Sequence, residues 1–143
     1  MPANTLPIYT IQPDVSTNGT TGMSQPITAA AADYTGVSAN NILVHTAGSN
    51  GSYVKSLIFK AAGTNVAAVM RIYVNNGSTN TTAANNTLVA EVSLPATTSS
   101  TTAPLPDIEI PIEFGINPSF RIYVGLGAAV AAGWFVTTIA GKY

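Results

Sequence analysis

Alternation of apolar and polar residues is the feature of this sequence that most restricts its fold. In residues 107–114, three isoleucines and a phenylalanine alternate with Asp107, Glu109, Pro111 and Glu113. A period of two places the apolar side chains on one face of a β-strand and the carboxylates on the other. Because proline cannot donate to a β-ladder, Pro111 predicts that this strand lies at a sheet edge or carries a bulge there.

Further stretches have the alternation or the composition of β-strands, namely residues 42–46, 53–60, 70–74, 88–94, 120–126 and 134–140. Asn50-Gly51 and Asn76-Gly77 are typical of hairpin turns, because both residue types tolerate positive φ angles. Seven or eight short strands separated by such turns predict an all-β fold, an antiparallel two-sheet β-sandwich with little helix.

The alternation also assigns faces to the side chains. The alternation predicts that one face of their stretch is shared by Leu88, Ala90, Val92 and Leu94. Trp134 and Phe135 are neighbours and therefore point to opposite faces, so one ring is expected in the core.

The tetrapeptide Arg-Ile-Tyr-Val occurs twice, at residues 71–74 and 121–124. Its period of two turns the isoleucine and valine inward and the arginine and tyrosine outward. Arginine and tyrosine are enriched among the residues that dominate protein interfaces. The repeat therefore predicts partner contacts at Arg71, Tyr73, Arg121 and Tyr123, although ordinary residues on the surface of a sheet would show the same pattern.

The first 26 residues differ from the rest because they contain Pro2, Pro7, Pro13 and Pro26. Proline removes backbone donors, so we expect residues 1–26 to form an extended N-terminal arm and residues 27–143 a single β-sandwich domain. Apolar residues on the arm need a surface to pack on. Two interpretations remain open for them, an edge strand on their own domain or docking on a neighbouring molecule; the residues concerned include Leu6, Ile8 and Tyr9.

Charged residues make up only 8% of the chain, with 5 basic and 6 acidic residues and a net charge of −1, against about 25% in an average protein. This balance argues against a nucleic-acid partner, which would need a basic surface. Low net charge favours association, and threonine, serine and asparagine cost less to desolvate than charged groups do. We therefore expect a surface that is covered by copies of the chain or by another protein.

Few residues offer chemistry. The chain has no cysteine and one histidine, His45, which excludes disulfides, thiolate nucleophiles and multi-histidine metal sites. Asp107, Glu109 and Glu113 share a strand face, but such acids are more often solvated or paired with arginine than catalytic. No stretch has the apolar length of a signal peptide or a transmembrane helix. We expect no enzyme, no cofactor, no metal and no membrane partner.

Several segments of the chain resemble small virion proteins of tailed bacteriophages, in particular capsid decoration (cement) proteins with a jelly-roll fold. The resemblance spans about residues 27–143 and is carried by Ala39-Asn40-Asn41-Ile42-Leu43-Val44, Asn50-Gly51-Ser52-Tyr53-Val54, Asn86-Thr87-Leu88-Val89-Ala90-Glu91-Val92-Ser93-Leu94-Pro95, Arg121-Ile122-Tyr123-Val124-Gly125 and Ala132-Gly133-Trp134. These are patterns of strands and turns, and the family has no catalytic residues to carry over.

The resemblance implies a jelly-roll-like sandwich made in the host cytoplasm and placed on the outer surface of a virion capsid. Its partners would be the major capsid protein and further copies of the chain, as a dimer or trimer. Two alternatives stay open. One is a phage tail or fibre part or a carbohydrate-binding module that uses Trp134, Tyr123 and Tyr73; the other is a hydrolase built on Glu109 and Glu113.

Overall fold

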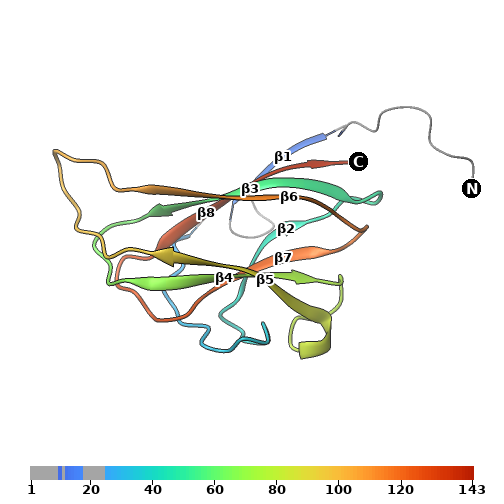
Figure 1. The fold of residues 1–143 in the computed structure, drawn as a ribbon, viewed down its shortest axis with the longest axis horizontal. Coiled ribbons are helices and arrows are strands. Elements are labelled where there is room, and N and C mark those ends of the chain that lie inside the picture. Colours follow the sequence, from blue (N-terminus) through green and yellow to red (C-terminus); the bar gives the residue numbers. More distant parts are fainter. Residues whose placement is uncertain (1–9, 11, 18–24) are drawn as a thin grey trace, which may run out of the picture.

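Two four-stranded antiparallel sheets face each other in the computed structural model of the chain (Figure 1). The structure describes residue 10, the backbone of residues 12–17, and residues 25–143. One sheet has the order β1-β8-β3-β6 and the other the order β2-β7-β4-β5. The strands are β1 (Gln12–Thr17), β2 (Ile42–Thr46), β3 (Ser52–Ala61), β4 (Ala68–Asn75), β5 (Asn86–Leu94), β6 (Asp107–Ile116), β7 (Arg121–Leu126) and β8 (Trp134–Lys142).

The strand order is that of an eight-stranded jelly roll. The first strand pairs with the last, β2 with β7, β3 with β6 and β4 with β5, as in one long hairpin wrapped around a core. Pairing of β3 with β8 and of β4 with β7 then joins these strand pairs into the two sheets. The sequence-based prediction of an all-β, jelly-roll-like sandwich is confirmed. In the described part of the chain the helical element is one short 3₁₀ turn, Ala83–Asn85.

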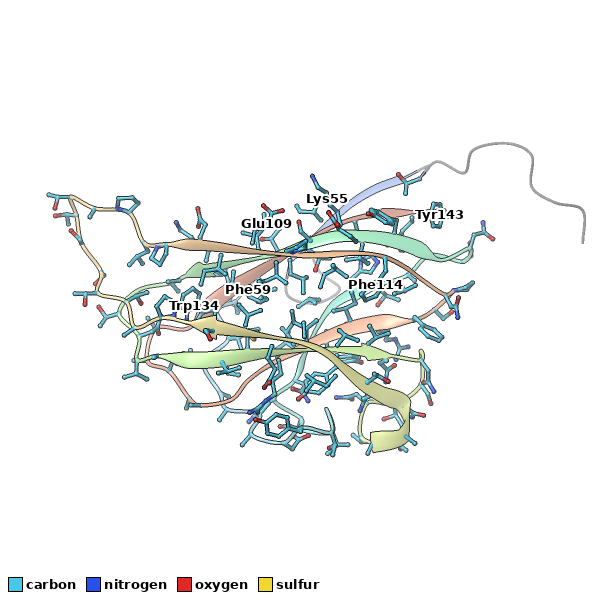
Figure 2. The ribbon with its side chains drawn as sticks, viewed as in Figure 1. Lys55, Phe59, Glu109, Phe114, Trp134 and Tyr143 are labelled. Atoms are coloured by element: carbon cyan, nitrogen blue, oxygen red, sulfur yellow. The ribbon has the colours of Figure 1, made fainter. Side chains whose placement is uncertain are left out.

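The core lies between the sheets and follows the predicted alternation. Figure 2 shows Phe59 and Trp134 between the two layers, while Lys55 and Glu109 point away from them. Trp134 is fully buried and Phe135 is half-buried, as expected for neighbours on opposite faces. Fully buried side chains come from both sheets, among them Val54, Leu57, Phe59, Met70, Ile72, Ile122, Val124 and Val136.

Strand β6 confirms both consequences expected of Pro111. It is the edge strand of its sheet, and its pairing with β3 shifts register between Val54 and Ser56. Glu113 has a φ of 54° in this irregular part of the strand. Left-handed backbone is costly for a residue other than glycine, and it is found where a bulge bends an edge.

The expectation for Leu88 is wrong, because β5 also carries a bulge. The β4–β5 pairing changes register between Ile72 and Tyr73, so Ile72 pairs with Ala90 and Tyr73 with Leu88. Leu88 therefore shares the side of Tyr73, away from the core cluster that includes Val92 and Leu94 and against which Ala90 packs. One inserted residue exchanges the faces of every side chain beyond it.

Part of the expected N-terminal arm is a strand. Residues 12–17 form β1, which pairs with Thr137–Lys142 of β8 and so forms an edge of its own domain. Leu6, Ile8 and Tyr9 lie outside the described residues. The division into an arm at 1–26 and a domain at 27–143 stays a prediction for the remainder of that segment.

Candidate interaction surface

The repeated tetrapeptide brings its side chains onto one surface. Strands β4 and β7 are adjacent and antiparallel, so Tyr73 pairs directly with Tyr123 and Asn75 with Arg121. Cross-strand partners point to the same side of a sheet. The two copies of the motif, far apart in sequence, thus build the outer face of the sheet β2-β7-β4-β5.

A loop of the chain itself covers part of this face. We call residues 27–41 the covering loop. It starts at Ile27, which exchanges two backbone hydrogen bonds with Trp134 of 2.9 and 3.1 Å, and it continues at Ala31, whose N–H donates to the Leu126 carbonyl at 2.6 Å. A Cβ on Gly125 would lie 2.9 Å from the Cβ of Ala31, so the loop can approach β7 this closely only over a glycine.

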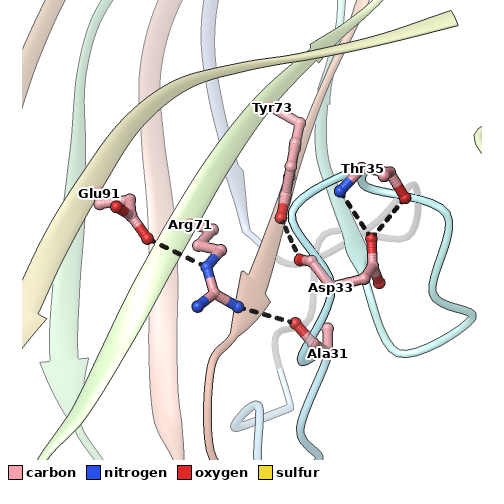
Figure 3. Close-up of polar contacts among 6 residues, drawn as sticks. All are labelled: Ala31, Asp33, Thr35, Arg71, Tyr73 and Glu91. Atoms are coloured by element: carbon pink, nitrogen blue, oxygen red, sulfur yellow. Dashed lines mark hydrogen bonds and ion pairs between the residues drawn. The ribbon is translucent and has the colours of Figure 1, made fainter. Parts of the chain in front are cut away.

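A buried arginine of β4, Arg71, binds the covering loop (Figure 3). Arg71 Nε donates to Glu91 Oε1 at 3.0 Å, and Arg71 Nη1 donates to the Ala31 carbonyl at 3.3 Å. The guanidinium also lies 3.9 Å from the centre of the Tyr34 ring. Burial lowers the pKa of Arg71, but the bond to Glu91 and the contact with Tyr34 outweigh it and raise that pKa overall.

A second contact holds the covering loop two residues further along, at Asp33. The Tyr73 hydroxyl donates to the Asp33 carbonyl at 2.9 Å (Figure 3). Asp33 Oδ1 in turn accepts from the backbone N–H and the hydroxyl of Thr35 at 2.9 and 2.8 Å. Burial would raise the pKa of Asp33, but these bonds and those from the backbone of Gly36 and Val37 lower it. Burial, followed by the nearby Asp33, raises the pKa of Tyr73.

The predicted partner contacts must therefore be corrected at Arg71 and Tyr73. Both side chains point outward as expected, but they are only 7% and 1% exposed, because the covering loop lies over them. Arg121 and Tyr123 are half-buried, and Arg121 Nη1 donates to the Ser78 carbonyl at 3.2 Å. A contact of these two residues with a partner stays a prediction.

Tyr34 is the surface residue that sequence reasoning missed. It is 61% exposed, and its ring rests on the Arg71 guanidinium. A signal for it existed, because Asp33-Tyr34-Thr35-Gly36 is a turn sequence in which aspartate caps the backbone two residues on. Gly36 completes that turn with a φ of 76°. The turn fixes the backbone around Tyr34, while Arg71 supports its ring.

The histidine and the acids of β6 lie on different strands. His45 is buried within β2, and Glu109 and Glu113 are exposed on the β6 edge. Asp107 pairs with Lys60 at 2.8 Å. Among the residues that the structure describes, no group of three or more histidine, cysteine, aspartate or glutamate side chains is placed to hold a metal ion.

Comparison with known protein families, with curated proteins and with solved structures finds no match to this chain. In residues 25–143 and the other described positions, no helix has the length and hydropathy needed to cross a membrane.

Proposed function

We propose that this chain is a structural virion protein that decorates and cements the outer surface of a bacteriophage capsid. It bridges neighbouring subunits of the major capsid protein and stabilises the shell. The proposal is supported by the resemblance of residues 27–143 to capsid decoration proteins and by the jelly-roll strand order that this resemblance implies. The proposed attachment is multivalent, because many weak contacts with a repeated lattice add up to firm binding.

The covering loop is the observation that carries this proposal. The buried Arg71 is paired with the exposed Glu91 at 3.0 Å, so a partner does not have to desolvate a free arginine. Tyr34 stands above them, held in place by the Arg71 guanidinium and by the Asp33 turn. An exposed tyrosine with little freedom left to lose is the type of residue that dominates protein interfaces.

Two of the three aromatic residues that the carbohydrate-binding alternative would use are buried. Trp134 is fully buried and Tyr73 is 1% exposed, so neither ring presents a face on which a sugar can stack. The hydrolase alternative would need Glu109 and Glu113 to face a substrate pocket. Neither of them lines any of three hollows formed by the described residues, and Glu113 lies in the bulged part of an edge strand.

Cosedimentation with capsids tests the proposal. Purified chain is mixed with expanded, undecorated capsids of the phage that encodes it, and bound copies are counted after centrifugation. We expect saturable binding of many copies per particle and greater resistance of the shell to heat. Tyr34→Ala should weaken binding by about tenfold or more. Val66→Ala is the matched control, because Val66 is equally exposed on a different loop, at 62%. Absence of binding by the unmodified chain would refute the proposal.

A further inference from the structure

An apolar groove opens between the two sheets, where the edge strands β5 and β6 face each other. It encloses about 320 Å³ and is lined mainly by Val74, Thr87, Val89, Phe114, Ile116 and Phe120. A second hollow of about 480 Å³ adjoins it and shares Gly115, Ile116 and Asn117 with it. We call the first hollow the edge groove. Figure 2 shows Phe114 at this end of the sandwich.

The two bulges explain why the sandwich is open here. The register shift opposite β4 falls in the part of β5 that contains Val89, and the shift opposite β3 falls just before Phe114 in β6. Val89 is 40% exposed and Phe114 37%, so two large apolar side chains face water across the same opening. Apolar surface gathered in one place on a soluble domain marks a contact with another molecule.

Charge limits what can cover the groove. None of the side chains that line the edge groove or the adjoining hollow is charged. The charged residue nearest along β5 is Glu91, which is already paired with Arg71 of its own chain at 3.0 Å. Two acids of β6, Asp107 and Glu109, lie at the start of that strand. The third, Glu113, directly precedes Phe114 and is exposed, but it does not line the groove.

We propose that the edge groove is the interface through which two copies of this chain associate about a two-fold axis. Each copy places its Val89 and Phe114 over the groove of the other. A two-fold axis brings the same surface against itself, so a patch is suitable only if it brings no like charges together. The lining of the edge groove meets this condition, because it contains no charged side chain. A chain with a net charge of −1 adds little long-range repulsion. This proposal deepens the proposed function by naming the surface through which copies associate.

Sedimentation velocity tests the dimer without any capsid. We expect the unmodified chain to pass from monomer to dimer between about 1 and 100 μM. Val89→Lys places a charge in the groove and should raise the dimer dissociation constant by about tenfold or more. Val66→Lys makes the same substitution at an exposed valine away from the groove and should leave the dimer unchanged. Circular dichroism checks that each variant is folded, and Thr87→Lys replaces Val89→Lys if that variant does not fold.

Two results would overturn the dimer. One is an unmodified chain that stays monomeric over the whole range, which is also the result expected if another protein occupies the groove. The other is a dimer that Val89→Lys or Thr87→Lys weakens no more than Val66→Lys does. A chain that dimerises through the groove but does not bind capsids refutes the proposed function alone, so the two failures are distinguishable.

Discussion

Replacing Asn65 with alanine should destabilise the sandwich, because this side chain joins three loops at one end of the sheets. Asn65 is 4% exposed, and its Oδ1 accepts from the N–H groups of Ala132 and Gly133 at 2.9 and 2.8 Å. Its Nδ2 donates to the carbonyl of Gly133 at 3.0 Å and to that of Gly63 at 3.3 Å. Its backbone also exchanges hydrogen bonds with Thr97.

The cost can be worked out group by group. Gly133 is buried, so its N–H would lose its acceptor without gaining water, at about 1–3 kcal/mol. Ala132 is half-buried and would recover part of its hydration, which leaves about 1 kcal/mol. The two carbonyls keep other donors, the Ala62 N–H on Gly133 and the Thr97 hydroxyl on Gly63, so they add little. The free energy of unfolding should fall by about 2–4 kcal/mol.

Urea denaturation followed by circular dichroism measures this loss. Asn76→Ala is the control, because Asn76 is exposed and its side chain bonds only to Ser78 and Asn85 among the described residues, both at 3.1 Å. The control should cost less than about 1 kcal/mol. If Asn65→Ala lowers the free energy of unfolding no more than Asn76→Ala does, the argument from orphaned backbone donors is wrong.

Two further predictions concern the covering loop. Gly125→Ala should loosen the loop and speed amide hydrogen exchange at Ala31, because the new Cβ would overlap Asn41 Oδ1. Gly115→Ala is the control and should leave exchange at Ala31 unchanged, because its Cβ would meet only a backbone oxygen at 3.7 Å. Equal exchange in both variants would contradict the close approach of the loop to Gly125. The lowered pKa of Asp33 means that its charged form is favoured in the folded chain, so its contribution to stability is present above the ordinary value of 3.8 and is lost as the pH falls through the folded-state pKa. Asp33→Asn should therefore reduce the acid dependence of unfolding below pH 3.8, and an unchanged pH profile would count against the Asp33 turn.

Strand positions could be read from the sequence because burial on one face of a sheet imposes a period of two. Pro111 also indicated that its strand lies at a sheet edge, because proline has no backbone N–H to donate and no distant contact changes this. The bulge between Leu88 and Ala90 left no comparable mark, because Leu88, Val89 and Ala90 are all apolar and fit either register. The sequence shows which residues share a face of a strand only where the two faces differ in polarity.

The surface around Arg71 could be predicted only in part, for a different reason. Alternation shows correctly that Arg71 and Tyr73 point away from the core, but it does not show what lies above them. The cover comes from the loop some 40 residues earlier, through the bonds of Arg71 to Ala31 and of Tyr73 to Asp33. Contacts at such separation depend on the whole strand order. The turn around Tyr34 could therefore be read from the sequence, but the support of its ring by Arg71 could not.

The two proposed contacts lie on different parts of the molecule, and this affects how firmly a shell can be held. Tyr34 stands on the covering loop over β4 and β7, while Val89 and Phe114 flank the opening between β5 and β6. A dimer formed through the edge groove therefore keeps a Tyr34 surface on each copy. Once one copy has bound to a lattice, the second is held near another site, and its effective concentration there can reach the millimolar range. Weak, uncharged contacts can then give lasting attachment, which is how a chain with so few charged residues would hold a capsid together.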